Sequence, residues 1–94
     1  HGIASEVNNH KTEQGILRNI SSKFSAGRYH SWIVNESDLP HELEVTATIE
    51  DGTIMAFQHK NFPVYGVQFH PESILTPMGK TIIFNWIEEI PSKN

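Results

Sequence analysis

The run of residues 43–57 most constrains the fold of this chain, because it carries the pattern of a β-hairpin. Apolar side chains alternate with Glu and Thr over residues 43–50, and a period of two places one row of side chains on a core and the other in water. Asp51-Gly52 follows and leads into the apolar run 53–57. An Asp-Gly pair between two such runs is a strong hairpin signal, since glycine tolerates the positive φ of a type I′ turn. The pattern predicts two antiparallel strands joined by a two-residue turn.

Three other segments have the composition of strands. Residues 29–34 and 64–69 are rich in aromatic and β-branched side chains, which favour strands. The second of these is apolar enough to lie inside a sheet. Residues 2–7 fit a short strand, and residues 15–20 fit one helical turn or a short loop.

The C-terminal region carries the signals of one helix. Thr76 can cap it with its hydroxyl, Pro77 suits the first helical position, and Pro91 is expected to end it. One apolar stripe at helical spacing contains Ile82, Ile83, Trp86, Ile87 and Ile90. We expect this stripe to pack on the sheet. The sequence therefore predicts a strand-rich α/β or α+β unit with one helix.

Composition narrows the functional classes. The 94 residues suffice for one small domain. The net charge is −4 and the lysines and arginines are scattered, so we predict no nucleic-acid partner, which would favour a basic face. No apolar run approaches the roughly 20 residues that span a bilayer, and no signal peptide is evident. We therefore predict a cytoplasmic protein with no membrane partner.

The chain has no cysteine, which excludes a disulfide framework, a thiolate metal site and a cysteine nucleophile within these residues. None of the six histidines has a histidine at the i, i+4 spacing of a helical zinc site. No serine stands in a Gly-x-Ser-x-Gly turn, the usual setting of a serine nucleophile in α/β-hydrolases. The sequence predicts neither a metal nor a cofactor.

His70-Pro71-Glu72 is the motif with the clearest chemical potential. Residues i and i+2 of an extended chain point to the same side, so His70 and Glu72 are expected to converge at the end of a strand. Pro71 favours an extended His70. An imidazole held by a carboxylate is a base with its orienting group, because the carboxylate fixes the tautomer and stabilises the imidazolium. The alternative is a surface His and Glu that flank a turn, since short His/acid patterns are common by chance.

The sequence around this motif resembles class I glutamine amidotransferase domains. Residues 66–73, Gly-Val-Gln-Phe-His-Pro-Glu-Ser, match the signature that closes those domains. Residues 28–31, 43–47 and 54–56 match in the expected order, as do residues 73–76 and, singly, His59, Gly79 and Asn85. The resemblance covers most of residues 26–87. It is greatest to the amidotransferase subunits of anthranilate synthase and of aminodeoxychorismate synthase.

The resemblance implies a Cys-His-Glu triad that hydrolyses L-glutamine and passes ammonia to a chorismate-binding synthase subunit. In that triad His70 is the base and Glu72 orients it. Ser31 and Trp32 match the segment that contacts the glutamine, although the family more often has leucine at the position of Trp32. The family carries its cysteine in the half of the domain that precedes this region.

We therefore expect residues 1–94 to be the C-terminal part of one flavodoxin-like, three-layer α/β domain, which lacks the nucleophile and is inactive alone. Tryptophan and folate biosynthesis are both open as pathways. Two non-catalytic interpretations also stand: a partner-binding module derived from such a domain, and a structural fragment without activity.

Overall fold

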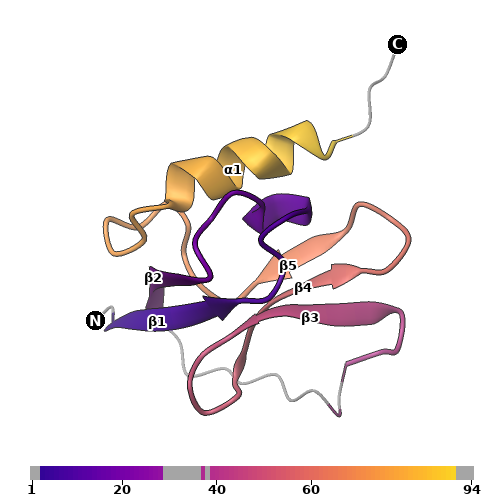
Figure 1. Ribbon diagram of the computed structural model, residues 1–94, viewed down its shortest axis with the longest axis horizontal. Helices are drawn as coiled ribbons and strands as arrows, with labels where there is room; N and C mark the ends of the chain where they lie inside the picture. Colours follow the sequence, from indigo (N-terminus) through magenta and orange to yellow (C-terminus); the bar gives the residue numbers. More distant parts are fainter. Residues whose placement is uncertain (1–2, 29–36, 38, 91–94) are drawn as a thin grey trace.

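The computed structural model describes residues 3–28, 37 and 39–90. Five strands in these residues form one antiparallel sheet in the order β2-β1-β3-β4-β5. The 3-10 helix η1 and the helix α1 lie on one side of this sheet, with η1 between α1 and the strands (Figure 1). The elements in chain order are β1 (Ile3–Asn9), η1 (Gly15–Leu17), β2 (Lys23–Arg28), β3 (Leu43–Thr48), β4 (Ile54–His59), β5 (Tyr65–Val67) and α1 (Gly79–Glu88). The predicted strand-rich α/β architecture with a hairpin and a C-terminal helix is confirmed.

The core lies between the sheet and the layer that η1 and α1 form. Its largest fully buried side chains are Val7, Leu17, Ile20, Ile54, Met55 and Ile82. Burying one such side chain contributes about 1.5–3 kcal/mol. The core therefore draws on β1, β4, η1 and α1, and it holds the sheet against the helical layer.

β3 and β4 form the predicted hairpin, but its turn has three residues rather than two. The N–H of Gly52 donates to Ile49 O at 2.9 Å, and the N–H of Ile49 donates to Thr53 O at 3.0 Å. Gly52 has a φ of 89°, whereas Asp51 has no positive φ. A type I′ turn needs positive φ at both central residues, so the predicted turn type is wrong. One left-handed glycine closes a bulge instead.

The two faces of β3 separate less cleanly than the alternation predicted. Thr46, which was expected to face water, is 3% exposed and follows the half-buried Val45. The pairing of β3 with β4 shifts register on both sides of Ala47. Such irregularities interrupt the alternation of side chains, so Thr46 and Ala47 are both buried.

β1 and β2 form a second hairpin, which the sequence predicted only in part. β1 agrees with the strand expected at residues 2–7, and η1 agrees with the expected helical turn. β2 was not predicted, because its Gly, Ala, Ser and Lys residues have weak strand propensity. Pairing with β1 along the whole of its length holds it in the sheet. The strand predicted at residues 29–34 lies outside the described residues.

α1 begins later than predicted. It starts at Gly79, with Met78 at the cap position and no side-chain capping bond. The hydroxyl of Thr76 instead donates to His70 O and accepts from Gly27 N–H. The predictions that Thr76 caps the helix and that Pro77 occupies its first position are therefore wrong, because Thr76 has buried backbone partners elsewhere.

The apolar stripe predicted on α1 divides between two faces of the helix. Ile82 is fully buried, and the half-buried Trp86 packs against the core. Four apolar residues of this region are 39% to 68% exposed: Ile83, Phe84, Ile87 and Ile90. Asn85, a polar residue, is buried in their place, at 7% exposure. The predicted stripe was too broad, because only one face of α1 contacts η1 and the sheet, and Ile83, Ile87 and Ile90 lie outside that face.

β5 was expected inside a sheet, but it is the last strand of the sheet that the described residues form. Beyond β5 the chain reaches the opposite edge, where His70 forms an isolated antiparallel bridge with Gly27 of β2. Phe69 packs edge-on against Phe24, with ring centroids 5.8 Å apart. The sheet is thus curled, and His70 lies where its two edges meet.

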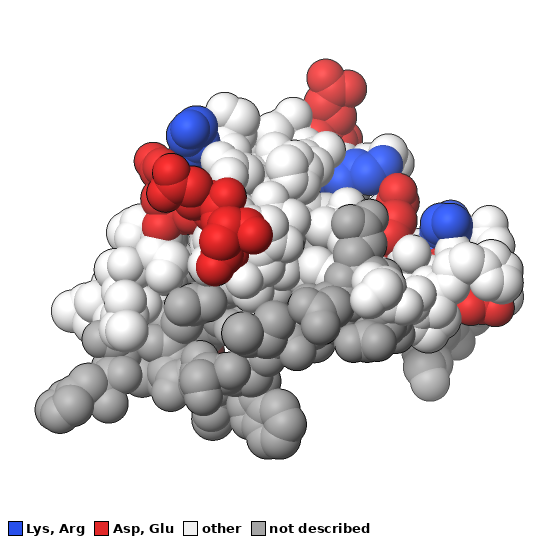
Figure 2. Space-filling view, turned by 90° about the horizontal axis from the view of Figure 1, so that it is seen from below, with Lys and Arg blue, Asp and Glu red and all other residues white. Residues whose placement is uncertain are grey.

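Acidic and basic side chains form small separate groups on the face shown in Figure 2, and the described residues there present no continuous basic strip. Neither helix of the described chain has the length and apolar character needed to cross a membrane.

Candidate active site

His70 and Glu72 lie where the chain leaves its contact with β2. Nδ1 of His70 and Oε2 of Glu72 are 2.9 Å apart, and the two side chains are 33% and 67% exposed. The residues meet across a turn in which the N–H of Ser73 donates to His70 O at 3.1 Å. The predicted contact is therefore present, but a turn brings it about, not an extended chain.

The environment of Glu72 favours its anionic form. A hydrogen bond from its own backbone N–H, followed by the hydrogen bond with His70, lowers the pKa of Glu72 below its ordinary value. A carboxylate that accepts Nδ1–H places the basic lone pair of the neutral imidazole on Nε2. The pair can thus hold an imidazole as a base and stabilise the imidazolium that forms after proton uptake.

Two of the predicted site residues, Ser31 and Trp32, lie outside the described part of the chain. Their predicted contact with glutamine stays a prediction. Of the four predicted site residues, the structure thus describes His70 and Glu72 and places them in contact. It also shows two residues that the sequence did not indicate for the site, Gly27 and Thr76, which hydrogen-bond to the backbone of His70.

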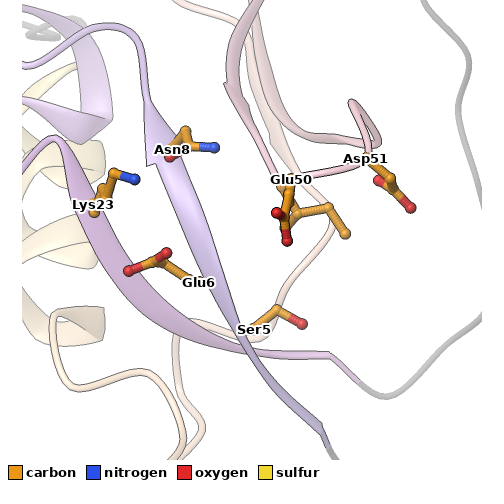
Figure 3. Close-up of a pocket in the computed structure, with 7 residues that line it drawn as sticks. Ser5, Glu6, Asn8, Lys23, Glu50 and Asp51 are labelled. Carbon is orange, nitrogen blue, oxygen red and sulfur yellow. The ribbon is translucent and has the colours of Figure 1, made fainter.

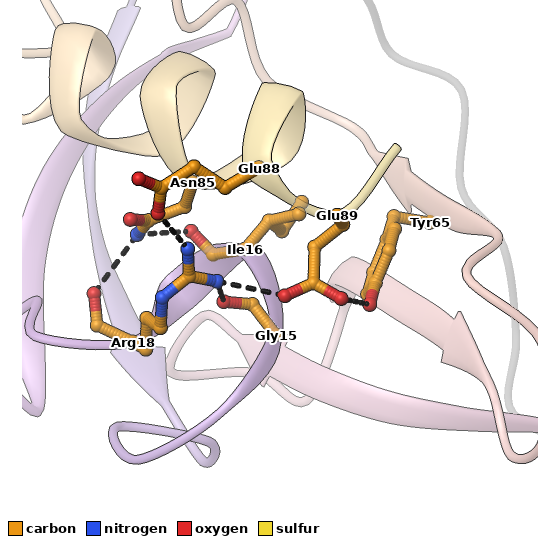
Figure 4. Close-up of polar contacts among 7 residues, drawn as sticks. All are labelled: Gly15, Ile16, Arg18, Tyr65, Asn85, Glu88 and Glu89. Carbon is orange, nitrogen blue, oxygen red and sulfur yellow. Dashed lines mark hydrogen bonds and ion pairs between the residues drawn. The ribbon is translucent and has the colours of Figure 1, made fainter. Parts of the chain in front are cut away.

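A second polar cluster, which no sequence motif indicated, joins α1 to η1 and β5 (Figure 4). We call it the α1–η1 cluster; it consists of Arg18, Tyr65, Asn85, Glu88 and Glu89. The guanidinium of Arg18 donates to both carboxylates and to a carbonyl of η1, that of Gly15. Tyr65 donates its hydroxyl proton to Glu89 at 2.6 Å. No local pattern could have revealed these contacts, because Arg18 is 70 and 71 positions from its carboxylate partners and Tyr65 is 24 positions from Glu89.

Asn85 and Tyr65 show what the cluster does: one binds backbone carbonyls, and the other has a raised pKa. The buried amide of Asn85 donates to Ile16 O and to Arg18 O, both at 2.9 Å. Burial, the hydrogen bond to Glu89 and the negative charge of Glu89 raise the pKa of Tyr65 to about 12. The cluster thus supplies polar partners for the carbonyls of η1 and keeps Tyr65 protonated, which indicates a structural role.

A groove of about 550 Å³ lies between β1 and the turn of the β3–β4 hairpin (Figure 3). β1 and β3 share only two residue pairs, those of Asn8 and Asn9, so the part of β1 that precedes Asn8 separates from β3 and leaves this space. The groove is lined by Ser5, Glu6, Asn8, Lys23, Ile49, Glu50 and Asp51. It includes neither His70 nor Glu72. Within residues 3–28, 37 and 39–90, no group of three or more His, Asp or Glu side chains is placed to hold a metal ion.

The chain is similar to subunits of anthranilate synthase from several organisms. It is 46% identical over 96 residues to anthranilate synthase beta subunit 2, chloroplastic, of Arabidopsis thaliana, which covers 99% of this chain and 35% of the relative. It is 47% identical over 87 residues to anthranilate synthase component 2 of Mycobacterium tuberculosis, covering 93% of this chain and 37% of the relative. The chain thus spans little more than a third of the length of these relatives.

One solved structure is similar to this chain in fold, and one family model matches its sequence. A GMP synthase component from Thermoplasma acidophilum superposes with a TM-score of 0.83 and 26% identity, over 92% of this chain and 42% of that one. The family model described as glutamine amidotransferase class-I matches residues 1–90, nearly the whole chain. The chain therefore belongs to the class I glutamine amidotransferase family.

Proposed function

We propose that these residues are the His/Glu part of the glutamine amidotransferase subunit of an anthranilate synthase. The subunit hydrolyses L-glutamine to glutamate and supplies the ammonia to a chorismate-binding partner. The observation that carries the proposal is the 2.9 Å contact between Nδ1 of His70 and Oε2 of Glu72. Membership of the family and the anthranilate synthase relatives support the substrate and the partner.

The proposed chemistry needs a thiol that this chain does not contain. A cysteine in the remaining part of the domain attacks the side-chain amide carbon of glutamine while Nε2 of His70 takes the thiol proton. The proton then passes to the amide nitrogen, which leaves as ammonia, and a thioester forms. Water activated by His70 hydrolyses the thioester and releases glutamate. Glu72 stabilises the imidazolium at each stage.

Ser31 and Trp32 complete the proposed site as the segment that contacts the glutamine. They follow β2 closely in the sequence, and β2 pairs with His70 through Gly27. We propose a cytoplasmic enzyme that requires no cofactor for this half-reaction. We also propose that residues 1–94 alone do not hydrolyse glutamine, since the thiol and the oxyanion donors belong to the other part of the domain.

The test compares two nitrogen sources in the full-length polypeptide that contains these residues, assayed together with its chorismate-binding partner. In His70→Ala, anthranilate formation from glutamine should fall by about 10²- to 10⁴-fold, because a general base is lost. Formation from added ammonium should stay within about twofold, because ammonium bypasses glutamine hydrolysis.

Glutamine-dependent activity that persists in His70→Ala would exclude His70 as the base. Loss of both activities would point to a damaged fold or interface instead, and a thermal unfolding curve separates those causes. If the partner released aminodeoxychorismate and not anthranilate, the amidotransferase assignment would hold and the pathway would be corrected to folate biosynthesis.

A further inference from the structure

The hydroxyl of Thr76 is inserted between β2 and the His70 turn. In an antiparallel bridge of the hydrogen-bonded kind, the two residues exchange two N–H···O=C bonds. Between Gly27 and His70 the first is present, since the N–H of His70 donates to Gly27 O at 2.9 Å. The second is replaced: the N–H of Gly27 donates to Oγ1 of Thr76 at 2.8 Å, and Oγ1 lies 2.8 Å from His70 O.

The direction of both hydrogen bonds follows from the chemistry of the three groups. A hydroxyl has one proton to donate and can accept through its lone pairs. The N–H of Gly27 can only donate and His70 O can only accept, so the Thr76 proton points at His70. Thr76 is 4% exposed, and a buried hydroxyl used in both ways at once fixes the two groups it joins.

The surrounding chain is shaped to admit this contact. A Cβ on Gly27 would lie 2.9 Å from Cβ of Leu75, and a Cβ on Gly79 would lie 1.7 Å from Pro71 O. Both distances are shorter than those that Cβ atoms keep from other heavy atoms in proteins. Only glycine at these two positions therefore lets the turn pack against β2 on one side and the start of α1 on the other. The N–H of Ser73 and the N–H of Thr76 also donate within the turn, to His70 O and Ser73 O.

We propose that Thr76 is a positioning residue for His70: its hydroxyl fixes the His70 carbonyl against β2 and thereby sets the direction in which the imidazole leaves the sheet. In this role Thr76 touches neither substrate nor nucleophile and acts through the backbone of His70. The proposal rests on the proposed function, in which His70 is the base of glutamine hydrolysis.

The test uses glutamine hydrolysis by the full-length polypeptide with three substitutions. Thr76→Val keeps the shape and removes the hydroxyl; kcat should fall by about 10- to 100-fold with KM changed less than about twofold, because a misplaced base slows the chemical step. Thr76→Ser keeps the hydroxyl, and its kcat should stay within about threefold of the parent. Thr46→Val is the matched control, since Thr46 is a buried threonine on β3, and its kcat should be unchanged.

The outcomes separate the two proposals. Activity that survives His70→Ala overturns the proposed function. If His70→Ala is inactive and Thr76→Val keeps its kcat, only the positioning role of Thr76 is overturned. The positioning role is overturned as well if the kcat of Thr76→Ser falls as far as that of Thr76→Val. A rise in KM with an unchanged kcat in Thr76→Val would also overturn it. Should Thr76→Val not fold, Thr76→Ala, which leaves room for a water, is compared with Thr76→Ser in its place.

Discussion

The His70 turn and the α1–η1 cluster are both built from charged and hydrogen-bonding side chains, yet they differ in how they arise. His70 and Glu72 stand two positions apart, and their contact is exposed to solvent. In the cluster, Arg18 and Glu89 are 71 positions apart and their contact is partly buried. The first pair can form in a short peptide, whereas the second exists only in the folded chain. We therefore expect changes in the turn to affect chemistry and changes in the cluster to affect stability.

Asn85→Leu should have the largest effect on stability, because leucine has a similar shape but no amide. The carbonyls of Ile16 and Arg18 would lose the Asn85 donor in a buried site, and the free energy of unfolding should fall by about 2–3 kcal/mol. Urea unfolding of the full-length polypeptide measures this loss. The kcat of glutamine hydrolysis, measured well below the unfolding temperature, should not change.

Lys80→Ala provides the control for that substitution, since Lys80 is on the exposed side of the same helix. Its free energy of unfolding should change by less than about 0.5 kcal/mol. An Asn85→Leu protein as stable as the parent would break the comparison, because the cluster would then contribute nothing to the fold.

Glu72→Gln should have the next largest effect and should act on catalysis alone. Glutamine keeps an acceptor for Nδ1–H but removes the charge that stabilises the imidazolium, so kcat should fall about tenfold, or about 1.4 kcal/mol. Stability should be unchanged because the Glu72 side chain is 67% exposed. Steady-state kinetics and a thermal unfolding curve check the two halves of this expectation.

Glu42→Gln is the matched control for Glu72→Gln, because Glu42 also lies beside a histidine, His41, at 3.8 Å on the surface. Its kcat should equal that of the parent. Equal losses in the two variants would mean that the charge acts through the general field of the protein and not through the His70 contact.

Tyr65→Phe should have the smallest effect, a loss of about 1 kcal/mol of stability at neutral pH from the missing hydrogen bond to Glu89. This loss should depend on pH. Burial and then Glu89 raise the pKa of Tyr65 from 10.0 to about 12, so the stabilisation by protonated Tyr65 is complete below pH 10 and disappears as the pH approaches 12. The difference between parent and variant should shrink over that interval in unfolding experiments. A difference independent of pH would show that packing, and not the hydroxyl, stabilises the parent.

The features that the sequence predicted are those with local causes. Alternation and Asp51-Gly52 located the hairpin, and His70 and Glu72 are close enough in the chain for their contact to be foreseen. Propensity failed at β2, because pairing with β1 holds that segment in the sheet. Thr76 carried the signal of a helix cap, but its hydroxyl is used by Gly27 and His70. Such a competition is decided by tertiary contacts that no single segment encodes.

The bridge between Gly27 and His70 also has a kinetic consequence. β3, β4 and β5 all lie between these two residues in the chain, so bringing the residues together closes a long segment at a cost in chain entropy. Contacts of such high sequence separation slow folding relative to local ones. The hairpins can form early, but His70 and Glu72 reach their final positions only when the curled sheet closes. In the full-length polypeptide, recovery of the proposed glutamine hydrolysis during refolding should therefore lag behind the recovery of the β-strand signal in circular dichroism.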